Sequence, residues 1–363
     1  MEFWEKTRWV VILLLIALLT WRVNSKSYTS DFEKKYGMCS LGQSSRVRMD
    51  CFMESFKGGF LMVGTRGLLS ELESSFNKND NADGGGITKC HDATHAIGML
   101  AGMSSRDLQS TFAQCSNMCG YGCHMGVIEG YFDTNPGSFD NFWNLCKTSS
   151  HVYSCVHAVG HYIGHKTQNV SESLAVCDKI VDLEYRGHCT SGVFMELFDQ
   201  PIHSDVGNLI PNNIPEFCKT LSGVHKSFCF TMSGFYEYLS TGDFVAGVDM
   251  CLNSPQEDVC ITNYSKSLFY HMNGSAPRLY DFCKSVPTHL LRSCQSGVIN
   301  ASLLSDPILR HGLEFCSLYP SDDKLACLSE LGSLVQNSPG GSRLKREAVC
   351  SRLNEEDRQV CMK

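Results

Sequence analysis

Short apolar segments separated by polar turns recur along most of the chain, and they predict helices. In one kind of segment a small residue precedes an apolar run that ends in a polar residue, as in Gly126-Val127-Ile128-Glu129. Similar segments occur at 192–196, 234–237 and 297–299. A second kind of apolar segment, such as 142–145 or 214–217, comes before a polar turn such as 254–255 or 319–322. The alternation predicts a repeated unit of helix, short turn and helix.

The cysteines follow the same alternation. The chain has 363 residues and 20 cysteines. Sixteen of the cysteines form eight close pairs with eight to eleven residues between the partners: Cys39/Cys51, Cys146/Cys155, Cys177/Cys189, Cys218/Cys229, Cys251/Cys260, Cys283/Cys294, Cys316/Cys327 and Cys350/Cys361. Zinc sites use shorter spacings, so we interpret each pair as a disulfide that joins the end of one helix to the start of the next.

The pairs recur at a nearly constant distance. From Cys146 to Cys350, the first cysteine of each pair follows the previous one at almost the same interval, and only the step from Cys177 to Cys218 is clearly longer. A fixed period predicts stacked units, here an all-α, right-handed solenoid of disulfide-tied helical hairpins with a repeat of about 33 residues. From Cys115 to Cys361 this layout resembles disulfide-bridged Sel1-like and tetratricopeptide repeat proteins. The resemblance is confined to the architecture and implies no partner or activity.

The N-terminal segment predicts export. Lys6 and Arg8 precede a thirteen-residue apolar run from Trp9 to Trp21. The run has the length of a signal-peptide core, whereas its flanking tryptophans are typical of a membrane anchor. Residues 1–25 are therefore either a signal peptide or an N-terminal membrane anchor. Both alternatives place the body outside the cytoplasm, where disulfides persist.

Composition divides the rest of the chain. We expect an N-terminal helical segment at 26–75, a Gly- and Asn-rich loop at 76–89, histidine- and cysteine-rich repeats at 90–170, and cysteine-paired helical repeats at 171–363. The net charge is −7 and there is no long basic run, which argues against nucleic acid as a partner. The expected partner is a small molecule or a protein, together with a membrane if the N-terminal segment is retained.

Histidines accumulate in the 90–170 region. His91, His124 and His157 are evenly spaced, at the period of the cysteine pairs, and the HxxxH spacing occurs at His91/His95 and at His157/His161/His165. On a helix this spacing places two imidazoles one turn apart on one side, as in many metal sites. We therefore expect five histidines to meet around one or two transition-metal ions, with His165 and Glu129 adjacent. These five are His91, His95, His124, His157 and His161.

The neighbouring residues leave alternatives open. Asp92 could orient His91 or His95 through a hydrogen bond. Five glycines accompany the histidines and indicate either close helix packing or room for a ligand: Gly98, Gly122, Gly126, Gly160 and Gly164. Later repeats keep the cysteines and lose the histidines, so the disulfide scaffold does not itself need them. A purely structural histidine network is the alternative to a metal site.

Imidazole and carboxylate ligands suit zinc, iron or copper. The string from Cys119 to His124 has one residue more than the haem-attachment motif CxxCH, so covalent haem is not expected. We expect Cys115, Cys119 and Cys123 to form disulfides, one of them with Cys90.

Two classes of function remain. The chain has no GxSxG, no HExxH and no Gly-rich phosphate loop. The favoured hypothesis is an exported metal-binding protein, with metal-dependent hydrolysis or oxidation using Glu129 as the base. The alternative is a non-enzymatic scaffold that binds a protein partner.

Overall fold

The computed structural model describes residues 31–41, 44–79, 86–149, 151–198, 211, 213–305, 309–337 and 343–362. Within these ranges every regular element is helical and there is no strand. The predicted all-α class is therefore confirmed. The predicted signal peptide or anchor, residues 1–25, lies outside the described residues, and none of the described helices is long and apolar enough to span a membrane.

Long and short helices alternate along the chain. The long helices are α2 (Ser45–Asn79), α3 (Gly86–Met103), α5 (Gly122–Thr134), α7 (Val152–Thr167), α9 (Leu183–Phe198), α12 (Gly223–Thr241), α14 (Glu257–His271), α16 (Leu291–Ser305) and α18 (Ser321–Asn337). The shorter elements are α4 (Leu108–Phe112), η1 (Pro136–Asn141), α6 (Phe142–Lys147), α8 (Val170–Cys177), α11 (Ile214–Thr220), α13 (Phe244–Leu252), α15 (Ala276–Ser285), η2 (Thr288–Leu290), α17 (Arg310–Ser317), α19 (Arg343–Cys350) and α20 (Glu355–Cys361).

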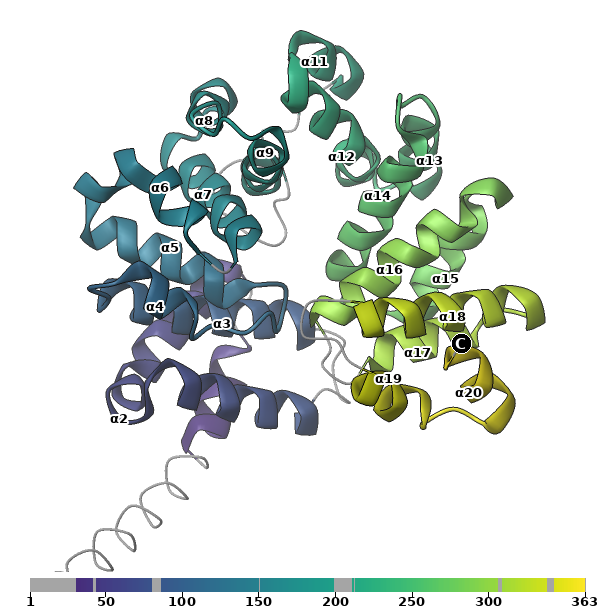
Figure 1. Cartoon of the computed structure of the whole chain (residues 1–363), viewed down its shortest axis with the longest axis horizontal. Helices are drawn as coiled ribbons and strands as arrows, with labels where there is room; N and C mark the ends of the chain where they lie inside the picture. The colour runs from purple at the N-terminus through teal and green to yellow at the C-terminus, as the bar shows by residue number, and fades with distance from the viewer. Residues whose placement is uncertain are drawn as a thin grey trace, which may run out of the picture.

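Each long helix packs against the next long helix. The succession α2, α3, α5, α7, α9, α12, α14, α16 and α18 is continuous, and α20 follows α18. Figure 1 shows an arch: one arm rises from α2 to α9, α11 lies at the top, and α12 to α20 form the other arm. The shorter helices pack beside the long ones, and the buried core runs through the whole stack.

Ten disulfides join all 20 cysteines, each of which lies within the described ranges. The eight predicted pairs are present, from Cys39–Cys51 to Cys350–Cys361. The two remaining bonds are Cys90–Cys119 and Cys115–Cys123, so one cysteine of the 115–123 group pairs with Cys90 as expected. This density of disulfides fits an oxidising environment outside the cytoplasm.

The two arms also contact each other. Thr88 donates its hydroxyl to the side-chain oxygen of Asn273 over 2.7 Å, although 185 residues separate them. The backbone N–H of Gly120 donates to the carbonyl of Leu304 over 3.4 Å, and α3 packs against α14. The histidine-rich arm therefore faces the second arm at close range.

The loop predicted at 76–89 is shorter than expected. Helix α2 continues to Asn79 and α3 begins at Gly86, so both ends of the segment are helical, and 80–85 lie outside the described residues. Arg48 of α2 forms a buried ion pair with Asp92 of α3, with Nε 2.5 Å from Oδ2. This pair and the packing of α2 on α3 hold the two helices together on the two sides of the segment.

Removing the Cys90–Cys119 bond should destabilise the protein without unfolding the other repeats. The bond closes a loop with a sequence separation of 29. In the chain-entropy model such a loop stabilises the folded state by about 3–4 kcal/mol. We expect the Cys90→Ser/Cys119→Ser variant to unfold at a lower temperature, measured by calorimetry under non-reducing conditions. Peptide mapping without reduction checks the bond itself, and a linkage of Cys90 to any other cysteine would contradict this assignment.

Candidate metal-binding site

Close packing of glycines brings the histidine helices together. A Cβ on Gly126 of α5 would lie 2.0 Å from the backbone oxygen of His95, and one on Gly98 of α3 would lie 2.1 Å from the oxygen of Cys123. Helices α7 and α9 repeat the arrangement, because a Cβ on Gly160 or Gly192 would lie 2.1 Å from a backbone oxygen of the other helix. Of the two explanations for the glycines, the structure shows close helix packing.

The first histidine–glutamate set consists of His91, His95 and Glu129. His91 donates its Nδ1–H to the carbonyl of Cys119 over 2.8 Å, which leaves Nε2 as the nitrogen with the lone pair. His95 places Nε2 3.0 Å from Oε2 of Glu129 on α5. The set therefore links an HxxxH helix to a carboxylate on the next long helix.

The second histidine–glutamate set consists of His157, His161 and Glu196, and it repeats the first. His157 donates Nδ1–H to the carbonyl of His188 over 3.2 Å. His161 places Nδ1 3.2 Å from Oε2 of Glu196, and His165 places Nδ1 3.4 Å from Oε1 of the same carboxylate. In both pairs of helices, α3 with α5 and α7 with α9, histidines of the first helix contact a glutamate of the second.

Glu196 is a site residue that our sequence analysis did not identify. His157 follows His91 by two repeat periods, and Glu196 follows Glu129 by the same interval plus one position. A search for a doubled repeat would have identified Glu196 as the partner of Glu129.

The two imidazoles of the second set face each other. Nε2 of His157 lies 3.1 Å from Nε2 of His161. Each ring places its Nδ1 at an acceptor, the carbonyl of His188 or the carboxylate of Glu196. The two Nε2 atoms can share a proton, with a doubly protonated His161 donating to both Glu196 and His157, or they can share a metal ion when both rings carry their proton on Nδ1.

Burial and pairing divide the charges within the site. Burial lowers the pKa of His91 to about 3, with a smaller contribution from neighbouring His95, and burial also lowers the pKa of His157. Burial alone would lower the pKa of His95, but the charge of Glu129 and its hydrogen bond outweigh it and the pKa is raised. Burial alone would raise the pKa of Glu129, but the charge of His95 and its hydrogen bond to Glu129 outweigh burial, so the pKa of Glu129 is lowered. Glu129 is therefore ionised and paired with His95 at neutral pH.

The carboxylates open onto a cavity of about 730 Å³, which we call the α2 cavity. One side of it is lined by His95, His161, His165, Glu129 and Glu196. Helix α2 forms the opposite wall through Met49, Met53, Phe60 and other residues. As the side chains stand, the described residues contain no group of three or more histidine, cysteine, aspartate or glutamate side chains arranged to hold a metal ion.

His124 does not join the other histidines. Its ring is fully buried and packs 4.5 Å from Phe112 and 5.4 Å from His151, centroid to centroid, and it does not line the α2 cavity. The physical reason is helical geometry: His124 and Glu129 are five residues apart on α5, and five steps of about 100° place them on different faces.

Asp92 also differs from expectation. Its carboxylate accepts hydrogen bonds from Ser45 and Arg48 of α2, each over 2.5 Å, and those bonds use both oxygens. Asp92 therefore fixes α2 to α3 and does not orient a histidine through a hydrogen bond.

Buried His124 should make the protein sensitive to acid. Burial, and to a lesser extent His151, lowers its pKa to about 3 from the 6.5 of an exposed histidine. Below pH 6.5 the unfolded chain binds a proton that the folded protein excludes, so stability falls as the pH falls. From pH 7 to pH 5 the loss from this one group is about 2 kcal/mol.

The His124→Phe variant tests this contribution. Among the described residues neither ring nitrogen of His124 has a hydrogen-bond partner, so phenylalanine should fit among the aromatic neighbours and be more stable already at pH 7. The melting temperature should fall less between pH 7 and pH 5 in the variant than in the wild type. An equal fall in both proteins would show that His124 is accessible to protons.

Comparison with known proteins adds no family to this geometry: no family model, no curated protein and no solved structure matches the chain. The site must therefore be interpreted from its own residues.

Proposed function

We propose that this chain is an exported metal-binding protein that holds a transition-metal ion between His157 and His161. The observation that supports it is the facing pair of Nε2 atoms 3.1 Å apart, each on a ring whose Nδ1 contacts an acceptor. Two nitrogens that bind one tetrahedral ion at about 2.0–2.1 Å lie about 3.3 Å apart. Acceptors at the second ring nitrogen are the usual support of metal-binding histidines.

The first histidine–glutamate set supplies a third ligand in this proposal, His91 or His95, so that a tetrahedral ion keeps one open position. His91 already has its Nδ1 fixed by Cys119, and its pKa is lowered by burial and, to a smaller extent, by His95 and His161. His95 would have to exchange its ion pair with Glu129 for the metal. Because Glu129 raises the pKa of His95, His95 keeps its proton to higher pH than an exposed histidine, and metal uptake should release protons.

The α2 cavity makes catalysis the favoured use of the metal. His161 and Glu129 both line it, so a substrate in the cavity would reach the metal and an ionised carboxylate together. A metal with an open position activates water or polarises a substrate. We therefore favour a metal-dependent hydrolase or oxidoreductase in which Glu129 accepts a proton, with zinc, iron or copper as the ion.

The proposal also covers the repeat architecture of the chain and the location of the protein outside the cytoplasm. The succession of long helices supports a right-handed solenoid with a repeat of about 33 residues, in which the histidine-bearing helices form one double unit. The ten disulfides support secretion or anchoring on the outer face of a membrane.

Elemental analysis of the protein, expressed into an oxidising compartment with each metal supplied, tests the proposal. We expect one or two metal ions per chain. The Glu129→Gln variant then distinguishes two roles of Glu129. If Glu129 is the base, the variant should retain its metal; if Glu129 is a ligand, the variant should lose it. Metal-free protein under every condition would favour the alternative, a non-enzymatic scaffold with structural histidines.

A further inference from the structure

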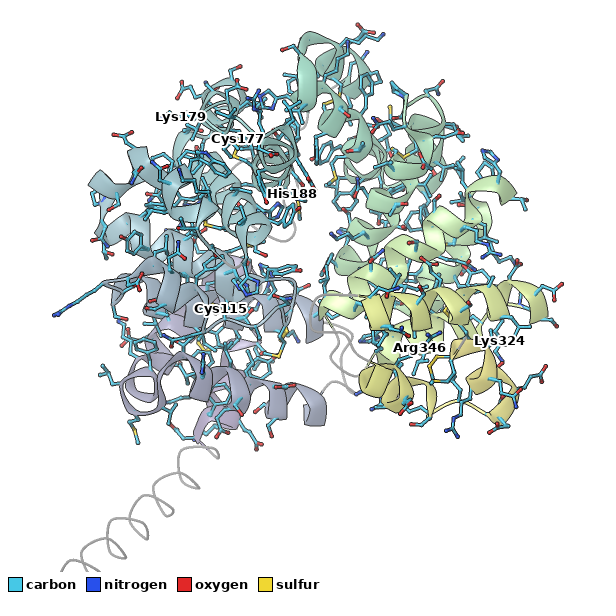
Figure 2. All side chains as sticks on the ribbon, in the orientation of Figure 1. Cys115, Cys177, Lys179, His188, Lys324 and Arg346 are labelled. Atoms are coloured by element: carbon cyan, nitrogen blue, oxygen red, sulfur yellow. A yellow bond between two sulfur atoms is a disulfide. The ribbon has the colours of Figure 1, made fainter. Side chains whose placement is uncertain are left out.

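A second cavity, of about 290 Å³, lies between the two arms, and we call it the central cavity. His91, His157 and His188 line it from the first arm, and Asn263, Lys266 and Tyr270 of α14 line it from the second. His188 lies on the side of its arm that faces the other arm (Figure 2). The close contacts between the arms at Thr88 and Gly120 therefore build the walls of this cavity.

We infer that the central cavity binds a small organic carboxylate whose anionic group pairs with Lys266. The described residues that line the cavity include no aspartate and no glutamate. They do include several hydrogen-bond donors: Lys266, His188, Tyr121, Tyr270, Asn263 and three serines. A cavity with an amine, several donors and no acid is complementary to a negative charge.

No described residue supplies Lys266 with a counter-charge. None of the ion pairs between described residues includes Lys266, which is half-buried on α14. Burial lowers its pKa, and no nearby carboxylate opposes that effect. A desolvated amine without an acidic partner costs free energy, and a bound anion would recover it.

The rest of the lining specifies the body of the ligand. The apolar part of the lining consists of Met125, Met195, Met232, Phe228 and Leu304. The volume is at the small end for ligand cavities, so a carboxylate with a compact aliphatic or aromatic body fits best. Methionines adapt to varied shapes, so binding should tolerate different bodies of similar size.

This inference does not depend on a metal. It rests on Lys266 and on the composition of the lining. His91 and His157 line this cavity and also belong to the two histidine–glutamate sets, but the tests on Lys266 need no metal. Failure of either proposal would leave the other intact.

The test uses matched pairs of charged and uncharged probes with the full, disulfide-intact protein. Benzoate is compared with benzamide, and hexanoate with hexanamide, by isothermal titration calorimetry and by thermal shift. We expect saturable binding of the carboxylates and at least about tenfold weaker binding of the amides, since the charge interaction is worth about 1.4 kcal/mol or more. Equal binding of acid and amide, or no binding of either carboxylate, would overturn the inference.

Substitutions locate the binding. Lys266→Met should remove the preference for the acid, and Lys266→Arg should retain it. The matched control is Lys284→Met, which alters a lysine that lies over the ring of Tyr280, 5.3 Å from its centroid and away from the cavity. If inorganic phosphate binds tightly and the organic acids do not, the site is one for phosphate and the carboxylate assignment is wrong. If Lys266→Met does not fold, the acid and amide comparison in the wild type still decides the question.

Discussion

Replacing His161 with alanine should abolish stoichiometric metal binding by the purified protein. Nε2 of His161 lies 3.1 Å from Nε2 of His157, and Nδ1 of His161 contacts Glu196. The variant therefore loses one ligand and leaves a buried carboxylate with one fewer partner. Because loss of a supporting residue alone costs 10–100-fold in affinity, we expect at least about 100-fold weaker zinc binding for loss of a ligand.

The measurement is competition with a chromogenic chelator at pH 7.5, after removal of bound metal. The matched control is His124→Phe. It removes another buried histidine of the same region, one that lies on a different face of α5 from Glu129. It should retain the wild-type affinity. If His161→Ala binds zinc within threefold of the wild type, the metal is held elsewhere or not at all.

Replacing Gly126 with alanine should be among the most destabilising single changes in the chain. The added Cβ would lie 2.0 Å from the backbone oxygen of His95 and 2.7 Å from the backbone nitrogen of Met99. Backbone atoms cannot rotate away, so α3 and α5 must separate, and we expect a loss of about 3 kcal/mol or more. Separation would also pull His95 from Glu129 and weaken metal binding.

Gly58→Ala is the control for this change. Gly58 lies on the exposed face of α2, and a Cβ added there would have nothing within 4 Å, so alanine should stabilise the helix by up to about 1 kcal/mol. Thermal unfolding of both variants gives the comparison. A Gly126→Ala protein as stable as the wild type would mean that α3 and α5 are not packed through their glycines.

The sequence was most informative where one local pattern determines one contact. A short spacing between cysteines allows a disulfide within a helical hairpin, and all eight such pairs form. The HxxxH spacing likewise placed His157 and His161 on one side of α7, where their rings are in contact.

Contacts between distant helices were harder to predict. The even spacing of the histidines placed His124 with the others, yet the rotation of α5 turns it toward Phe112. Asp92 lies beside the histidines in sequence, but α2 provides Arg48 as its partner 44 residues away. The central cavity depends on α3 meeting α14, and neither the cysteine period nor the histidine spacing encodes that approach.

The most direct test of the metal proposal is anomalous X-ray diffraction from crystals of the zinc-loaded protein, recorded on both sides of the zinc absorption edge. The account predicts an anomalous peak about 2.0–2.1 Å from Nε2 of both His157 and His161. The account would be contradicted by a map that has no peak at these two nitrogens although zinc fully occupies a site elsewhere in the protein. In that result the two rings would still be hydrogen-bonded to each other.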